Sequence, residues 1–477
     1  MTSLAPILPE LILSIGAIVL MMVAAFTGRR GSGVVSWLAV ALLVAATIAL
    51  IGAPSHAGPL FDGFLSADLF GSFGKAIIFP AAAVAIVAAH GWFERNTEHA
   101  SEYAVLILFS AVGMSVMVSA TSLIALYVGL ELQSLAAYVL ASYRRTDERS
   151  AEAGLKYFVL GALASGILLY GISLLYGFTG TMSFNGLAAA FGRGAPSLGL
   201  LFGLVFVLAG LAFKASAVPF HMWTPDVYEG APTPVTAFFG SAPKAAAVLL
   251  ATRLCIEGLG PATDAWRQIV IFAALASIFL GAVAAYGQTN IKRLLAYSSI
   301  NNVGFALVGL AAAGPQGASS VLFYMAVYIV MTLGAFLCVL WMRDAEGRPI
   351  ESIASLSGLA QTRPAFAAAF AIFMFSLAGI PPLFGFWPKL LVFNAAVASG
   401  YVLLAVAAIL GTVIGAYYYL RIIKVMYMDE PAEPYARVRQ PVQGLLILLA
   451  AIFVSPLGYL LIGPLGQLSD RAAGTLF

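Results

Sequence analysis

Charge is scarce in this sequence of 477 residues. Only 9% of the residues are charged and 61% are hydrophobic, and the mean hydropathy is +0.97. Soluble domains carry about 25% charged residues. A soluble fold needs a polar surface that this composition cannot supply. The chain is therefore expected in a lipid bilayer.

Groups that bind metals, redox cofactors or nucleotides are equally scarce. Cys255 and Cys338 stand alone in apolar segments, which argues against a disulfide framework or an iron–sulfur site. No glycine-rich phosphate-binding loop opens a helix, so nucleotide binding has no support. The four histidines are too scattered for a haem or zinc cluster; they are His56, His90, His99 and His221. We expect no cofactor and no metal in this chain.

Long apolar runs fill the rest of the sequence. In lipid, backbone polar groups must be satisfied within helices or a closed barrel, and runs such as Gly199–Ala212 lack the alternation of barrel strands. The pattern predicts an all-α polytopic membrane protein with about fourteen transmembrane helices of about 20 residues each. The predicted spans lie near 7–26, 34–52, 68–90, 103–119, 121–142, 153–177, 198–229, 235–257, 267–287, 293–312, 318–341, 364–399, 401–427 and 441–464.

The basic residues indicate the orientation of these spans. Sixteen of the 24 lysines and arginines fall on one side, and only Arg193, Arg267 and Arg471 fall on the other. By the positive-inside rule the richer side is the cytoplasm. We expect a single membrane domain, residues 1–477, in the bacterial inner (plasma) membrane, with both termini on the periplasmic side. Since topology explains the basic residues, the net charge of +3 does not indicate a nucleic-acid partner.

Two windows, 198–229 and 364–399, are too long for one straight crossing. Each contains a similar proline-bounded segment, Pro219–Pro225 and Pro382–Pro388. The two windows are five spans apart and so cross in opposite directions, as paired broken helices do in secondary transporters. The sequence predicts broken seventh and twelfth helices within inverted repeats, 103–257 and 267–427.

Four ionisable residues lie deep in the spans: Glu131, Lys214, Lys244 and Lys389. Glu131 is about 15 Å into its helix. A charge at the bilayer centre costs about 2.5–3.5 kcal/mol or more, and such residues are functional by default. Snorkelling to the interface or a structural ion pair remains the alternative.

Two further charged residues, Lys75 and Arg253, lie closer to the ends of their spans. For these two, snorkelling or a structural ion pair is the preferred interpretation.

A proline accompanies each buried lysine. Proline lacks an N–H and frees the carbonyl four residues earlier, which at membrane depth must meet water or a neighbouring helix. A hydration point is therefore predicted beside each lysine. The prolines are Pro219, Pro243 and Pro388, and the freed carbonyls are those of Ala215, Phe239 and Phe384.

Glu131 and Lys214 could form a proton switch. Burial disfavours a charged lysine and a nearby carboxylate favours it, so the lysine would hold its proton when paired and release it when separated. Arginine would stay charged. His221, seven residues beyond Lys214, could be an intermediate carrier because imidazole exchanges its proton near neutral pH. A polar packing role for His221 is the alternative.

Three segments carry a resemblance to a known family: Phe213–Phe238, Lys156–Gly166, and Leu294–Ile300 with Gly304. They resemble the antiporter-like membrane subunits of respiratory complex I, NADH:quinone oxidoreductase. The resemblance covers essentially the whole chain and is closest to the subunit N branch, the counterpart of mitochondrial subunit 2.

The resemblance implies a proton-translocating subunit without a redox site. Glu131 resembles the glutamate of the fifth helix, Lys214 its partner, Lys244 the central lysine and Lys389 the terminal residue of the path. Partners would be the other membrane and peripheral subunits, which hold NADH, FMN, iron–sulfur clusters and quinone. One departure is Asn301-Asn302, where relatives usually have a histidine, because asparagine cannot carry a proton.

Three functions stay open: a proton-translocating subunit of the oxidoreductase, a subunit of a cation/proton antiporter without a redox partner, and a structural membrane subunit. The four buried charges argue against the third. The first two need the same charges, and the resemblance alone favours the first.

Overall fold

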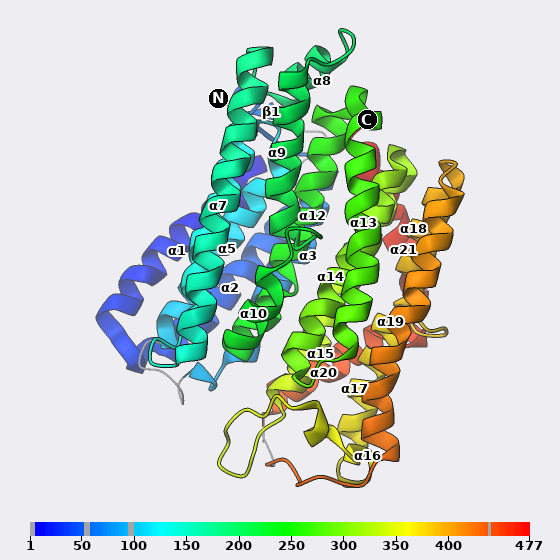
Figure 1. Cartoon of the computed structure of the whole chain (residues 1–477). Helices are drawn as coiled ribbons and strands as arrows, with labels where there is room; N and C mark the ends of the chain where they lie inside the picture. Colours follow the sequence, from blue (N-terminus) through cyan, green and yellow to red (C-terminus); the bar gives the residue numbers. More distant parts are fainter. Residues whose placement is uncertain (1–4, 52–57, 94–99, 437–439) are drawn as a thin grey trace.

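The computed structural model describes residues 5–51, 58–93, 100–436 and 440–477, and this part of the chain is almost entirely helical (Figure 1). Two short strands, β1 (Pro59–Leu60) and β2 (Leu65–Ser66), pair antiparallel. Of the residues named above, His56 and His99 lie outside the described ranges.

Twelve of the helices in the described ranges are long and apolar enough to cross a membrane, and thirteen if a pair bent by 64° near the C-terminus counts as one span. The prediction of an all-α multi-pass membrane protein is confirmed. The helices are α1 (Leu8–Thr27), α2 (Ser32–Ile51), α3 (Leu69–Ala89), α5 (Ala100–Ser119), α6 (Leu123–Ala141), α7 (Glu148–Thr179), α8 (Phe184–Phe191), α9 (Leu198–Ala215), α10 (Trp223–Gly230), α11 (Thr233–Phe239), α12 (Ala242–Arg253), α13 (Thr263–Tyr286), α14 (Ile291–Ala312), α15 (Gly314–Leu340), α16 (Leu359–Thr362), α17 (Pro364–Ala378), α18 (Phe386–Ala398), α19 (Val402–Met428), α20 (Pro441–Val454) and α21 (Ile462–Gly474).

The chain leaves the helical conformation in both of the long predicted windows. Helix α9 ends at Ala215 and α10 begins at Trp223, while α17 ends at Ala378 and α18 begins at Phe386. Each intervening segment contains one cis proline peptide bond. Helices α17 and α18 are each shorter than a full crossing. The interior prolines therefore fall where the backbone departs from the helix.

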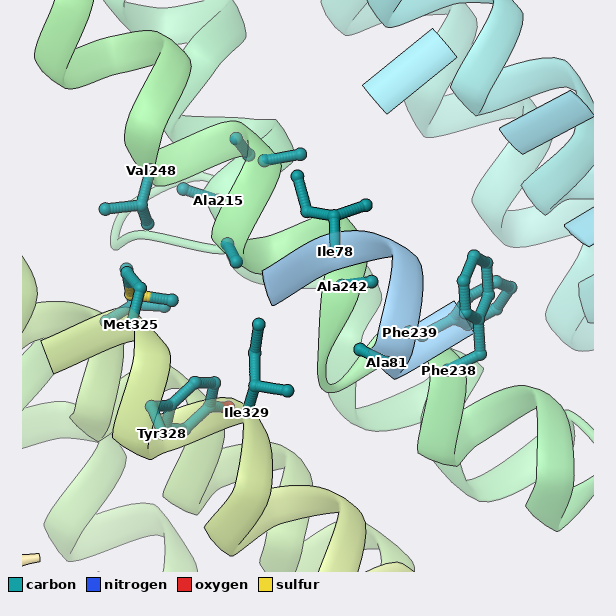
Figure 2. Close-up of a cluster of buried hydrophobic side chains, with 14 of the residues drawn as sticks. Ile78, Ala81, Ala215, Phe238, Phe239, Ala242, Val248, Met325, Tyr328 and Ile329 are labelled. Atoms are coloured by element: carbon teal, nitrogen blue, oxygen red, sulfur yellow. The ribbon is translucent and has the colours of Figure 1, made fainter. Parts of the chain in front are cut away.

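The middle of the bundle is built around α12, α14 and α15. Figure 2 shows side chains of α3, α11, α12 and α15 in one hydrophobic cluster, among them Ile78, Ala242, Val248 and Met325. Much of α12 is alanine, and small residues let neighbouring helices approach closely without a gap. Residues 233–255, which include all of α12, are buried, whereas less than a third of the most apolar stretch of α1 or of α2 is buried. Helix α12 therefore carries Lys244 through the protein interior.

Of the two arrangements expected for Arg253, the structure shows the ion pair and not snorkelling. Its side chain is 0% exposed, with Nη2 2.6 Å from Asp68 Oδ1 and Nη1 3.1 Å from Glu257 Oε1. Nε donates to the carbonyl of Val118 at 3.1 Å. Burial opposes ionisation of the Asp68 carboxyl, but the adjacent guanidinium outweighs it and holds the pKa of Asp68 below its usual range. Arg253 thus ties the end of α12 to the start of α3 and the end of α5.

Lys75 is also buried, and it too forms an ion pair rather than snorkelling. Its Nζ lies 2.5 Å from Glu10 Oε1, and the Ser115 hydroxyl donates to the same oxygen at 2.6 Å. These contacts join α3, α1 and α5. The ion pair therefore holds the first helix against the rest of the bundle.

Replacing Arg253 is expected to destabilise the fold more than replacing an exposed arginine. Arg253→Ala leaves two buried carboxylates without a cation, and breaking a buried pair costs about 3–5 kcal/mol. Arg348→Ala is the control because its ion pairs are exposed, and such pairs contribute about 0–1 kcal/mol. Thermal unfolding of the purified protein measures the difference. Equal losses in the two variants would show that the Arg253 cluster does not hold the fold.

Candidate functional site

Each of the three predicted lysines is buried beside a helix end. Lys214 is the second-last residue of α9, Lys244 the third of α12, and Lys389 the fourth of α18. Their exposures are 5%, 1% and 4%. Helix ends leave backbone groups without a partner in their own helix. The lysines therefore lie next to backbone polar groups that need hydrogen-bond partners.

Lys214 lies against α6 and α7. Its Nζ donates to the Ser134 hydroxyl at 2.6 Å and lies 5.8 Å from the ring centre of Tyr138 and 5.6 Å from that of Tyr157. Aromatic faces attract a cation. One hydroxyl and two ring faces can therefore stabilise the charged form of Lys214 away from water.

Trp223 closes the interruption between α9 and α10 around this lysine. Its indole N–H donates to the carbonyl of Phe213 at 3.0 Å, and its ring stacks on Tyr157 with centroids 4.3 Å apart. The first residue of α10 is thereby bound to the last turn of α9. This contact fixes the backbone next to Lys214.

Glu131 and Lys214 share a site but do not form an ion pair. The Glu131 carboxylate accepts a hydrogen bond from Ser165 of α7, and it is close enough to Lys214 to interact electrostatically. No ion pair between the two is present, although both residues are described. Ser134, three residues beyond Glu131 on α6, is the group that contacts Lys214. The structure thus brings the predicted pair together with Ser134 beside it.

Lys244 has a different environment. In the described part of the chain its Nζ has no hydrogen-bond partner, and it lies 5.3 Å from the ring centre of Tyr228 on α10. His221, half-buried between α9 and α10, is within electrostatic range of Lys244, and its Nδ1 is buried without a partner among the described residues. The Tyr228 hydroxyl is likewise unpartnered there. These polar groups have hydrogen-bonding capacity available for water or for a proton in transit.

Lys389 meets the end of α17 directly. Its Nζ donates to the carbonyls of Leu377 and Ala378 at 3.0 and 2.9 Å and lies 4.6 Å from the ring centre of Phe305. A helix C-terminus favours a cation. The prediction that Pro388 frees the carbonyl of Phe384 beside Lys389 was wrong, because that carbonyl accepts from the Trp387 N–H at 3.1 Å.

An ion cluster that the sequence did not reveal surrounds Asp226 of α10. Lys156 of α7 lies 2.9 Å from one carboxylate oxygen and Arg293 of α14 2.6 Å from the other, and Arg293 also lies 3.0 Å from Glu229. Lys156 and Asp226 both fall in the segments that carry the family resemblance, but their pairing depends on the packing of α7 against α10. The cluster joins helices that belong to the two predicted repeats.

No group of three or more His, Cys, Asp or Glu side chains in the described ranges is placed to hold a metal ion.

Comparison with known proteins places these features in a wider group. Residues 120–415 match a family model described as "NADH:quinone oxidoreductase/Mrp antiporter, TM". A protein of Rhizorhabdus wittichii named NADH-quinone oxidoreductase subunit N is 62% identical over 100% of this chain and 99% of its own length. One of the same name from Sphingopyxis alaskensis is 58% identical over 99% of each chain.

Solved structures show the same fold. A chain of respiratory complex I from Thermus thermophilus aligns with a TM-score of 0.82 and 30% identity, covering 96% of this chain and 99% of that one. A chain of the Mrp complex from Dietzia aligns with a TM-score of 0.84 at 23% identity, covering 100% and 98%. At that lower identity the likeness concerns the fold alone.

The position of the Lys389 side chain is expected to depend on the absence of a side chain at Gly379. Gly379 has φ +79°, and a Cβ there would lie 2.7 Å from Lys389 Cδ. Gly400 is a matched control, since it has φ +85° and nothing within 4 Å of the same added atom. Both Gly→Ala variants incur the left-handed strain of about 1–2 kcal/mol, but only Gly379→Ala adds the clash, of about 1–3 kcal/mol.

Thermal unfolding of the purified protein should therefore show the larger loss in Gly379→Ala. Equal losses would mean that Lys389 can move aside at no cost.

Proposed function

The chain belongs to the NADH:quinone oxidoreductase/Mrp antiporter family, and we propose that its row of buried charged side chains carries protons across the membrane. The chain is a membrane subunit of an NADH:quinone oxidoreductase, and electron transfer from NADH to quinone takes place in other subunits of that complex. The observation that supports the proposal most strongly is the set of three buried lysines, each at a helix end and each with different partners.

The proposed path runs from Glu131 and Lys214 through His221 to Lys244 and on to Lys389. Lysine suits this role because burial opposes its charge while carboxylates, carbonyls and ring faces favour it, so small movements change its protonation. Lys214 has a hydroxyl and Lys389 has two carbonyls, whereas Lys244 has none of these. A proton would therefore dwell at the two outer lysines and pass through the central one.

The second candidate function is a cation/proton antiporter subunit without a redox partner. The Dietzia Mrp chain supports the shared fold but only at 23% identity. Two relatives that are 62% and 58% identical, each aligned over 99% of its own length, are named as subunits of the oxidoreductase. The oxidoreductase subunit is therefore the better supported of the two. Co-purification of peripheral flavin and iron–sulfur subunits would distinguish it from the antiporter.

The topology that fits this function has fourteen spans, with α9 and α10 as a broken seventh and α17 and α18 as a broken twelfth. The inverted repeats would be 103–257 and 267–427. Ile7 and Phe477 line the same cavity, which supports an even number of crossings with both termini on one side. We place that side in the periplasm and the chain in the bacterial inner membrane, on the strength of the basic residues of the loops.

The position of Glu131 supports a membrane partner. It is half-buried on a face of α6 whose other residues are exposed: Ile124, Val128, Leu135 and Val139. A carboxylate at mid-bilayer depth facing lipid would be costly. We infer that another membrane subunit of the complex covers this face, while peripheral subunits hold NADH, FMN, iron–sulfur clusters and quinone.

Lys214→Ala is expected to abolish or strongly reduce NADH-driven proton translocation with the complex still assembled. Lys214→Arg should also impair translocation, because arginine cannot release a proton. The rate of proton uptake into membrane vesicles, normalised to assembled complex, measures both. Lys424→Ala is the control, since that lysine is exposed and pairs with Asp429. Full translocation by an assembled Lys214→Arg variant would remove Lys214 from the path.

The purified chain is expected to show no flavin, haem or iron–sulfur absorbance. Its two cysteines are both buried and unpaired, and the described residues offer no metal-binding group. Visible absorption spectra of the chain separated from its partners test this. A stoichiometric cofactor spectrum would contradict the placement of redox chemistry in other subunits.

A further inference from the structure

A hydrogen-bonded network fills the space where α14, α15 and α19 meet. The Tyr324 hydroxyl donates to Asn302 Oδ1 at 2.7 Å, and Asn302 Nδ2 donates to the Tyr419 hydroxyl at 3.3 Å and to the Ser298 carbonyl at 2.8 Å. The Ser298 and Tyr419 hydroxyls bond to each other. All four residues are buried. One amide therefore links the hydroxyls of two tyrosines in the protein interior.

The network lies between Lys244 and Lys389. On the side of Lys389, Phe305 lies three residues beyond Asn302 on α14, which is nearly one helical turn. The centre of its ring lies 4.6 Å from Lys389 Nζ. On the side of Lys244, Ser299 of α14 accepts a hydrogen bond from Tyr328 at 2.9 Å. Tyr328 is in turn within electrostatic range of Tyr228, whose ring lies beside Lys244. The buried hydroxyls therefore lie between the ring beside Lys244 and the ring beside Lys389.

Asn302 differs from its neighbour Asn301 in what it binds. Asn301 donates to a backbone carbonyl, that of Ile278, at 2.7 Å, which is an ordinary structural contact. Asn302 also donates to a backbone carbonyl, that of Ser298, but in addition its amide oxygen and nitrogen each bond to a tyrosine hydroxyl. A buried polar network costs stability unless every member is satisfied. Its presence here, rather than apolar packing, points to a role beyond holding α14 in place.

An amide has a fixed donor and a fixed acceptor, so it can orient hydroxyls but cannot take up and release a proton itself. A hydroxyl can accept a proton on its oxygen while giving up its own, so no net charge remains on it. Resting on the proposed function, we propose that Asn302 is a positioning residue that orients the Tyr324 and Tyr419 hydroxyls for proton transfer between Lys244 and Lys389.

The test compares Asn302→Leu with Asn301→Leu in the assembled oxidoreductase. Both changes replace a buried amide on the same helix with an apolar side chain that has the same branching and the same number of heavy atoms. Asn302→Leu should slow NADH-driven proton translocation per assembled complex by roughly ten-fold, less than the about 10²–10⁴-fold of a lost proton-transfer group because Asn302 only positions the hydroxyls. It should also raise the solvent deuterium isotope effect on that rate. Asn301→Leu should reduce the yield or melting temperature and leave both readouts unchanged.

Tyr324→Phe and Tyr419→Phe keep the rings and remove only the hydroxyls. They test the proposal even if Asn302→Leu does not assemble, and each should slow translocation with a raised isotope effect. Unchanged rates and isotope effects in the assembled Phe variants, or equal effects of the two Asn→Leu variants, would overturn the proposal. Lys244→Ala distinguishes a failure of the proposed function from a failure of the role of Asn302. If Lys244→Ala abolishes translocation while the Phe variants do not, the proposed function is supported and the role of Asn302 is wrong. If Lys244→Ala translocates normally, the proposed function itself is wrong.

Discussion

A polar group inside a bilayer must find its partner within the protein, and this constraint explains most of the described structure. Arg253 is held by two carboxylates and a carbonyl, and Lys75 by Glu10. Lys389 donates a hydrogen bond to a carbonyl at the C-terminal end of α17, and Lys214 donates one to the hydroxyl of Ser134. Where the chain gives up helical hydrogen bonds, a side chain replaces them. The helix interruptions and the buried charges are therefore two parts of one arrangement.

The same arrangement separates structural charges from functional ones. Arg253 has every neighbour it needs and stays charged, so it holds helices together. Among the described residues Lys244 faces a ring without a hydrogen-bond partner, and Lys214 bonds to one hydroxyl and faces two rings, so their charged forms are less firmly held. A lysine with weak partners can change its protonation when a neighbouring charge moves. The proposed path consists of such residues, linked by the hydroxyls of α14, α15 and α19.

Apolar runs, prolines and isolated charges in the sequence predicted the helical membrane fold, the places where the backbone leaves the helix, and the four deep charges. They could not predict that Ser134 would contact Lys214, because that contact depends on how α6 packs against α9. For Arg253 and Lys75 the sequence left snorkelling and an ion pair open, because the carboxylates Asp68 and Glu10 come from distant segments. In the sequence, Asn302 suggested only that a proton-carrying side chain is missing from this helix. Its contacts with Tyr324 and Tyr419 depend on how the helices pack, so the sequence could not predict them.

The central claim is that Glu131 and Lys214 act as one switch although no ion pair joins them. A double-mutant cycle of Glu131→Gln and Lys214→Ala, with NADH-driven proton translocation measured per assembled complex, tests it most directly. Both residues would bias the same protonation step, so the account predicts non-additive effects, with a coupling of about 0.5–3 kcal/mol. Effects that simply multiply would contradict the account and make the two residues separate stations along the path.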